Sequence, residues 1–262
     1  MNIRYVDIHS HLNFPDYDAD REEVIARMKE RGVATITVGT SLETSQSAVV
    51  LAEQHDNIFA CIGIHPIDDE QAYFDEEAFE ALVQHPKVVA VGECGLDYGR
   101  EGAIDESARQ QQIVLFEKQI DFAAKHDKPI MIHARNAHKD IIDILKSKKQ
   151  EYGKSLRGNA HFFTGTIEEA REYHDLDFST SFTGVVTFTR DYDEVVRSVP
   201  LEHMMSETDS PYVSPKPYRG KRNEPTYVVE VAKRIAEIKG VEEEIALKAL
   251  VSNAIAKFGL VW

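Results

Sequence analysis

The stretch YVDIHSH, residues 5–11, gives the first indication of the fold of this chain. Residues 5–8 form a short β-rich run, and His9 and His11 follow it with one residue between them. In an extended chain, residues two positions apart face the same side. The two imidazoles can therefore address one metal ion, and the stretch predicts a strand that ends at a metal site.

A helix is predicted directly after this strand. Asp20 stands where an N-cap is expected, with Glu23 three residues further on, as in a capping box. Gly32 stands where a glycine commonly ends a helix. The chain therefore starts with a strand and then a helix, and the same alternation continues through most of its length.

Eight β-rich runs alternate with helical sequence. The predicted strands are residues 5–8, 33–38, 58–64, 88–92, 129–133, 158–162, 176–182 and 203–206. Strands that alternate with helices indicate parallel βα units. An open doubly wound sheet is the rival architecture, but eight strands in 262 residues favour a closed (β/α)₈ barrel. We expect one domain over residues 1–262, with the active site at the C-terminal ends of the strands.

Composition limits the location and the partners of the protein. The sequence has no apolar run long enough to cross a membrane and no apolar signal-peptide core at its start. Two cysteines are too few for a disulfide framework. We therefore expect a cytoplasmic monomer or weak oligomer.

A net charge of −15 disfavours a broad nucleic-acid footprint, so a polyanion would have to meet a local basic patch or bound metal ions.

Metal-ligand residue types recur at the predicted strand ends. Glu93 follows the fourth strand, His133 ends the fifth, His161 ends the sixth, and Glu207 and Asp209 follow the eighth. All C-terminal strand ends of a barrel meet at one mouth. A nitrogen and oxygen ligand set suits Zn²⁺, Mn²⁺ or Mg²⁺. More than four ligands predict two divalent ions, an arrangement that recurs in phosphate-ester hydrolysis.

Seven segments in order resemble the signature segments of the TatD deoxyribonucleases. They are VDIHSHL, GIHP, VGECGLDY, IHAR, HFFTG, ETDSP and RGKRNEP, and the likeness runs from about residue 5 to the terminal NAIAKFG. The chain departs from the family pattern in GREGAID after GLDY and in Phe162-Phe163 after His161. The resemblance implies metal ligands at His9, His11, Glu93, His133, His161 and Asp209, with Glu93 as the bridging carboxylate.

The same resemblance implies the activity. It points to a divalent-metal-dependent deoxyribonuclease of the 3'-5' exonuclease type, acting on single-stranded or frayed DNA ends with a metal-activated water as nucleophile. Asp209 is our first candidate for the base that takes a proton from this water. Glu207, which also fits a role in orienting a ligand, is the second candidate, and His65 of GIHP is the third.

Substrate contacts are expected beside the mouth. Arg135, two residues past His133, is placed to reach a phosphate or to form a salt bridge at the rim. Residues 216–222 carry four basic side chains just after the eighth strand, and we expect them to grip a phosphate backbone. These four are Lys216, Arg219, Lys221 and Arg222. Tyr98 and Tyr212 are candidates for stacking on a base or for packing at the rim.

Two other functions remain open from the sequence. An amidohydrolase-type enzyme would cleave ester or C–N bonds, including the ester of an aminoacyl-tRNA. Many such enzymes bridge two metals with a carbamylated lysine after the fourth strand, where this chain has Glu93. A non-catalytic nucleic-acid-binding protein is the second alternative, and the complete ligand set and the acidic charge weigh against it.

Overall fold

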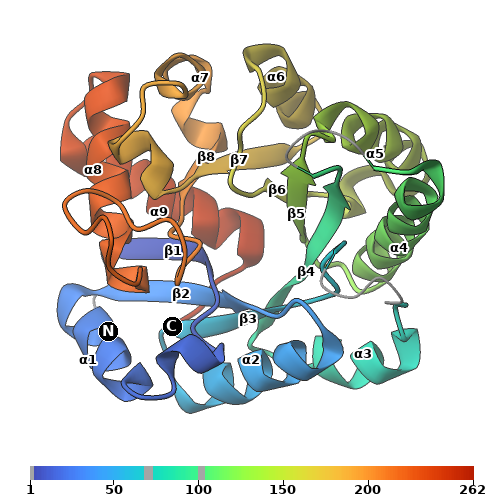
Figure 1. Ribbon diagram of the computed structural model, residues 1–262, viewed down its shortest axis with the longest axis horizontal. Helices are drawn as coiled ribbons and strands as arrows, with labels where there is room; N and C mark the ends of the chain where they lie inside the picture. Colours follow the sequence, from blue (N-terminus) through green and yellow to red (C-terminus); the bar gives the residue numbers. More distant parts are fainter. Residues whose placement is uncertain (1–2, 68–72, 100–103) are drawn as a thin grey trace.

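Eight parallel strands pair in chain order from β1 to β8 and are surrounded by helices (Figure 1). The computed structural model describes residues 3–67, 73–99 and 104–262. The strands are β1 Tyr5–Ser10, β2 Val33–Val38, β3 Ile58–Ile62, β4 Val88–Asp97, β5 Ile130–Arg135, β6 Gly158–Ala160, β7 Phe178–Phe182 and β8 Met204–Ser206. The predicted (β/α)₈ barrel is confirmed. Residues 100–103 of the GREGAID segment lie outside the described part of the chain.

The helices follow the strands in alternation. They are α1 Arg21–Arg31, α2 Leu42–Gln54, α3 Glu76–Val83, α4 Glu106–Lys125, α5 His138–Tyr152, α6 Ile167–Asp175, α7 Asp193–Ser198, α8 Val228–Lys239 and α9 Glu243–Phe258. Gly32 has the left-handed backbone (φ 66°) expected where α1 ends. The predicted capping box at the start of α1 is wrong. The Asp20 side chain makes no cap hydrogen bond, because its carboxylate is bound by Arg222 at 2.6 and 2.8 Å.

Strand β4 is longer than the sequence predicted. It continues from Val91 to Asp97, so Glu93 lies inside the strand and not after it. The two glycines of GECG allow close strand contact. A Cβ on Gly95 would lie 2.0 Å from the carbonyl oxygen of His133 on β5. Strand β6 is shorter than predicted, and His161 lies just beyond its end.

Two apolar clusters hold the barrel together. The larger one packs the helices against the strands, with buried aromatic side chains such as Tyr173 and Phe116. The smaller one joins side chains of β1, β2, β3, β4, β5 and β8 to Ala254 and Phe258 of α9. Helix α9 also contacts β1 and β8. The apolar core therefore fills the barrel away from the mouth and leaves the C-terminal strand ends to polar side chains.

Hydrogen bonds between the first strand and the segment after the last one close the barrel. The buried Asp7 carboxylate accepts from the backbone N–H of Thr208 at 2.8 Å and from its hydroxyl at 2.6 Å. The Asp209 N–H donates to the His9 carbonyl at 2.9 Å, and the His11 N–H donates to Ser210 at 2.7 Å. This seam places residues from the two ends of the chain in one wall of the mouth.

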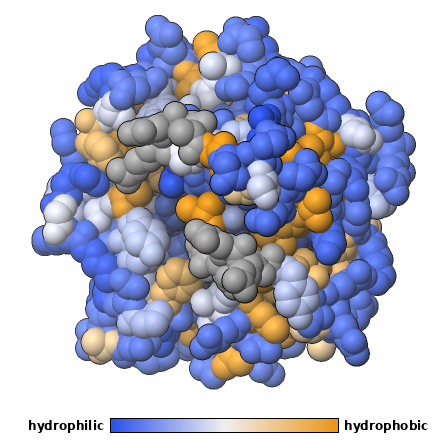
Figure 2. All heavy atoms as spheres, turned by 45° about the vertical axis from the view of Figure 1, so that its right-hand side comes forward, coloured by the Kyte–Doolittle hydropathy of each residue, from blue (hydrophilic) through white to orange (hydrophobic). Residues whose placement is uncertain are grey.

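The surface is mostly polar. The face shown in Figure 2 is largely hydrophilic, and its apolar side chains appear as separate spots. Within the described residues, no helix is both long and apolar enough to cross a membrane.

We expect the Asp7–Thr208 pair to be a major contributor to stability. Asp7→Ala would leave the N–H and hydroxyl of Thr208 buried without an acceptor, which costs about 1–3 kcal/mol for each group. Asp7→Asn keeps one oxygen acceptor and should cost clearly less. The free energy of unfolding from urea titration checks this, with Thr208→Val, which removes only the hydroxyl, as the matched control. Equal stability of Asp7→Ala and the unmodified chain would contradict this account of the seam.

Candidate metal centre

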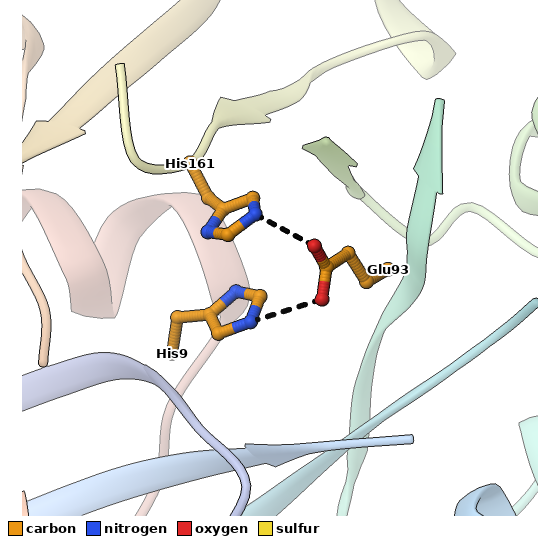
Figure 3. A group of neighbouring side chains, drawn as sticks. All are labelled: His9, Glu93 and His161. Carbon is orange, nitrogen blue, oxygen red and sulfur yellow. Dashed lines mark hydrogen bonds and ion pairs between the residues drawn. The ribbon is translucent and has the colours of Figure 1, made fainter. Parts of the chain in front are cut away.

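The carboxylate of Glu93 lies at the centre of the mouth, between histidines from different strands (Figure 3). The side chain is buried on β4. Its Oε1 lies 2.8 Å from Nε2 of His161 and 2.9 Å from Nδ1 of His133. Its Oε2 lies 3.3 Å from Nε2 of His9. The two oxygens therefore face two separate groups of side chains.

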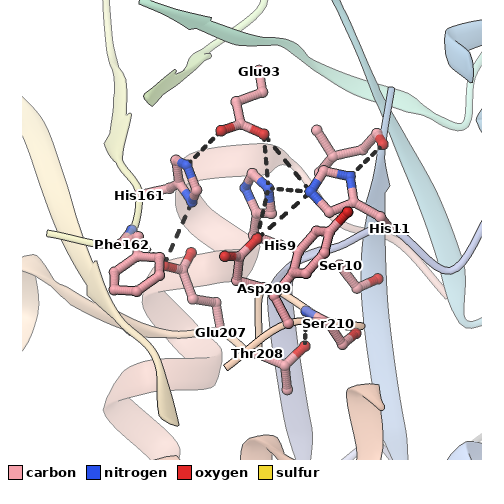
Figure 4. Close-up of polar contacts among 12 residues, drawn as sticks. His9, Ser10, His11, Glu93, His161, Phe162, Glu207, Thr208, Asp209 and Ser210 are labelled. Carbon is pink, nitrogen blue, oxygen red and sulfur yellow. Dashed lines mark hydrogen bonds and ion pairs between the residues drawn. The ribbon is translucent and has the colours of Figure 1, made fainter. Parts of the chain in front are cut away.

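The first group contains His9, His11 and Asp209 around Glu93 Oε2 (Figure 4). The Nε2 atoms of His9 and His11 are 3.3 Å apart. Asp209 Oδ1 lies 3.6 Å from His11 Nε2 and 3.9 Å from His9 Nε2. Ligands of a tetrahedral zinc ion sit about 2.0–2.1 Å from it, which puts neighbouring ligand atoms roughly 3.3–3.4 Å apart. These separations, together with the 3.3 Å between Glu93 Oε2 and His9 Nε2, are close to those expected around such an ion.

The second group surrounds Glu93 Oε1. His133 and His161 contact this oxygen directly, and Nε2 of His65 lies 3.6 Å from it. Glu93, His65 and His133 form one set of ligand atoms that a metal ion could join, and Glu93, His9 and His161 form another. The arrangement offers nitrogen donors on both sides of one carboxylate.

The hydrogen-bond partners of the histidines show that lone pairs point into the cluster. Nδ1 of His11 faces the Val38 carbonyl at 3.0 Å. A carbonyl only accepts, so Nδ1 carries the hydrogen and Nε2 of a neutral His11 offers a lone pair. Nε2 of His133 faces the Asp97 carboxylate at 2.8 Å, so in the neutral ring with its hydrogen on Nε2 the Nδ1 atom offers a lone pair toward Glu93. Lone pairs opposite carboxylate oxygens are favourable only with a positive charge between them, so the residues fit a cation.

The electrostatics of the cluster lead to the same conclusion. Burial alone would raise the pKa of Glu93, but the imidazoles of His161, His65 and His9 outweigh it and hold this pKa well below its usual value. Burial would lower the pKa of His161, but Glu93 and Glu207 raise it well above its usual value. Positive charge is thus strongly favoured beside Glu93, where protonated imidazoles carry it in the absence of metal and a bound divalent cation would supply it.

Glu207 does not face the cavity, which corrects its place among the candidate bases. It is fully buried, and its Oε1 accepts from the backbone N–H of Phe162 at 2.5 Å. Its Oε2 accepts from the Ser181 hydroxyl at 2.9 Å. Nδ1 of His161 lies 3.7 Å from Oε1. Glu207 therefore stands behind His161 and holds the backbone of Phe162, a position that suits orientation of a ligand and not contact with substrate.

A cavity of about 260 Å³ opens over the cluster. Its walls combine metal-ligand side chains with aromatic and cationic ones. The lining residues are His11, Phe14, Thr40, His65, Glu93, His133, Ala134, Arg135, His161, Phe162, Thr164, Asp209 and Tyr212. Phe14 and Phe162 were not among the sequence candidates. Their signal was their position a few residues past a ligand histidine, at the mouth of the barrel.

The basic candidates divide into two kinds. The Arg135 side chain is 47% exposed at the cavity, with one nitrogen 3.1 Å from Asp97. Arg222 is bound to the Asp20 carboxylate and to the backbone of Asp16, so its guanidinium is already occupied within the chain, which does not favour the predicted phosphate contact. The free cation expected there is used to fix the loop to the start of α1.

Arg219 of the same basic loop is also held by contacts within the chain. Arg219 lies 3.9 Å above the Phe188 ring and donates to the Ser214 carbonyl. Lys221 is exposed, and the described residues offer its ammonium no hydrogen-bond or ion-pair partner. Only this lysine of the predicted phosphate-binding set Arg219, Lys221 and Arg222 keeps an uncommitted charge there.

The two tyrosine candidates also differ. The Tyr98 hydroxyl donates to Asp140 at 2.5 Å, and its ring lies under the Arg109 guanidinium, so packing is the better interpretation. Tyr212 is 52% exposed and lines the cavity beside His11. Only Tyr212 remains placed to meet a substrate.

Comparison with known proteins shows the family of the chain. The family described as "TatD related DNase" matches residues 6–259. The metal-dependent hydrolase YabD of Bacillus subtilis (strain 168) is 43% identical over 245 residues, 92% of this chain and 93% of YabD. The 3'-5' ssDNA/RNA exonuclease TatD of Pantoea ananatis is 33% identical over 265 residues, 97% of this chain and 99% of that protein.

Solved structures extend the agreement to the whole fold. The crystal structure of YjjV, a TatD homologue from Escherichia coli K12, matches with a TM-score of 0.89 at 26% identity and covers 100% of both chains. The family resemblance noted in the sequence is thereby confirmed. The chain belongs to the TatD-related DNase family of metal-dependent hydrolases.

Proposed function

We propose that this protein hydrolyses phosphodiester bonds at single-stranded nucleic-acid ends, with two divalent cations bound on either side of Glu93. The observation that carries the proposal is the carboxylate of Glu93, whose two oxygens face two nitrogen-rich groups. The exonuclease name of the Pantoea ananatis relative supports the choice of substrate. The ligand residues are His9, His11, Glu93, His133, His161 and Asp209.

Divalent cations held here would lower the pKa of a water molecule and polarise a phosphoryl oxygen. Asp209 then has the task of accepting the proton of the attacking water. Its carboxylate is partly exposed, lines the cavity and lies beside both His9 and His11. Its backbone has φ 53° and donates to the His9 carbonyl, so the turn after β8 fixes the direction of the side chain.

Two further residues complete the proposed machinery. His65 lines the same cavity as Asp209, with its Nε2 atom 3.6 Å from Glu93, where an imidazole could pass a proton. The Arg135 guanidinium lies at the rim, where it forms an ion pair with the Asp97 carboxylate. A guanidinium binds two phosphate oxygens at once, so Arg135 is the proposed phosphate contact in a protein of net charge −15.

Removal of metal should abolish hydrolysis of a single-stranded oligonucleotide, and Mg²⁺, Mn²⁺ or Zn²⁺ should restore it. Glu93→Gln removes the shared negative charge, so we expect fewer bound ions per chain and almost no turnover. Isothermal titration with Mn²⁺ measures the number of ions, and gel analysis of a labelled oligonucleotide measures cleavage. Two bound Mn²⁺ ions and near-normal turnover in Glu93→Gln would contradict the bridging role.

Asp209→Asn should lower kcat by roughly 10²–10⁴, the usual effect of losing a general acid–base group, and change KM much less. Glu207→Gln keeps an oxygen toward Phe162, so its defect should be milder and partly rescued by excess metal. His65→Ala is expected to fall between them. Turnover measured across metal concentrations separates the three variants. If Glu207→Gln is the deepest defect at saturating metal, the base is not Asp209.

Arg135→Ala should raise KM for an oligonucleotide by roughly 10-fold or more, since hydrogen bonds to charged groups contribute about 1.5–3 kcal/mol. Arg222→Ala is the matched control. It removes a cation that is bound to Asp20, so it should lower the melting temperature and leave KM nearly unchanged. Initial rates over oligonucleotide concentration, with thermal melts of both variants, check this. If Arg222→Ala raised KM more than Arg135→Ala does, the loop would have to contact the substrate.

A further inference from the structure

Phe162 has an unusual backbone at the edge of the cavity. It follows His161 after the end of β6, and its φ of 44° lies in the left-handed region. The side chain is partly buried and lines the cavity. Left-handed backbone is unfavourable for an L-residue, and glycine or asparagine adopts it far more easily than phenylalanine. The local backbone therefore does not explain why an aromatic residue stands here.

Core packing does not explain it either. The neighbouring Phe163 is buried and packs edge-on against Tyr173 and Phe182. The aromatic contact recorded for Phe162 is with His161, at 6.4 Å between ring centroids. Unfavourable backbone conformations of this kind gather at functional sites. What Phe162 adds is a ring at the cavity wall.

The backbone of Phe162 is fixed from behind. Its N–H donates to the buried Glu207 carboxylate, which the Ser181 hydroxyl also binds. This bond holds the main chain whatever side chain residue 162 carries. The ring is thus presented from a rigid support, which lowers the entropy cost of using it to bind a ligand.

The rings at the mouth form a connected series (Figure 4). Phe162 meets His161 edge-on, His161 stacks on His9 at 3.9 Å, and His9 meets His11 edge-on. His11 in turn stacks on Phe14 at 4.5 Å. Phe162 and Phe14 therefore stand at the two ends of the series of proposed metal ligands, and Phe162 lines the same cavity as Arg135, the proposed phosphate contact.

We propose that the Phe162 ring stacks on the unpaired base next to the scissile phosphate and so sets the preference of this site for nucleotides over simple phosphodiesters. This inference rests on the proposed function and adds the group that recognises the base. Every base has a flat face, so a phenyl ring recognises bases without regard to sequence. A cavity of about 260 Å³ has room for one base at the wall that Phe162 forms.

The test compares two oligonucleotides that differ only in the terminal residue at the cleaved end. One has adenine there, and the other has an abasic tetrahydrofuran residue. Phe162→Asn suits the left-handed backbone and removes the ring, so folding should be kept. It should lower kcat/KM roughly 5- to 100-fold for the adenine end, the range measured for base–aromatic stacking, and change the abasic substrate less than about 2-fold. Phe162→Tyr keeps a ring and should behave like the unmodified chain.

A second measurement does not depend on turnover. An oligonucleotide with 2-aminopurine at its end loses fluorescence when that base stacks. Binding to Asp209→Asn with Mg²⁺ should quench it, and adding Phe162→Asn to Asp209→Asn should remove most of the quenching. Unchanged quenching, or equal loss of kcat/KM on both substrates, would overturn the inference. If the unmodified chain cleaves neither oligonucleotide while quenching still depends on Phe162, the proposed hydrolysis fails and the base contact stands.

Discussion

The buried carboxylate of Glu93 is the group on which the mouth of the barrel depends. It lies inside β4. The strand can place it there because Gly92 and Gly95 flank the pair Glu93-Cys94. A Cβ on Gly92 would meet the Met131 carbonyl at 2.4 Å, and one on Gly95 would meet that of His133 at 2.0 Å. Close contact between β4 and β5 is therefore possible only without these side chains. It places Glu93 within 2.9 Å of His133, a contact that a longer strand separation would lose.

The second requirement is the seam between the two ends of the chain. His9 lies in the first strand and His11 directly after it, and Asp209 comes from the segment after the last strand. The Asp7–Thr208 hydrogen bonds hold these parts in register. Burial raises the pKa of Asp7 well above its usual value, although the bonds from Thr208 oppose the shift. The stability of the barrel and the geometry of the ligand cluster thus rest on the same contacts, so the metal site forms only when the barrel closes.

Sequence alone predicted the parts of the site that follow from strand ends. Parallel strands bring their C-terminal residues together, so the sequence alone could group His9, Glu93 and His161 in one site. It could not predict where long polar side chains find partners. Asp20 looked like a helix cap and Arg222 like a phosphate contact, yet they bind each other across 202 positions of the chain. A ligand-orienting role for Glu207 was among the sequence expectations, but the sequence could not give its partner, the N–H of Phe162.

Charge completes the argument about the substrate. The chain has 45 acidic and 30 basic residues, and two arginines of the basic loop are occupied by internal contacts. Arg135 is the one Lys or Arg side chain among the residues that line the cavity, while Lys216 and Lys221 of the loop are exposed outside that lining. The rest of the attraction for a polyanion would have to come from cations beside Glu93, because bound ions are often the largest local charges in a site. Metal would therefore govern the affinity for nucleic acid as well as the rate of hydrolysis, which joins substrate binding and catalysis in one cluster of ligands.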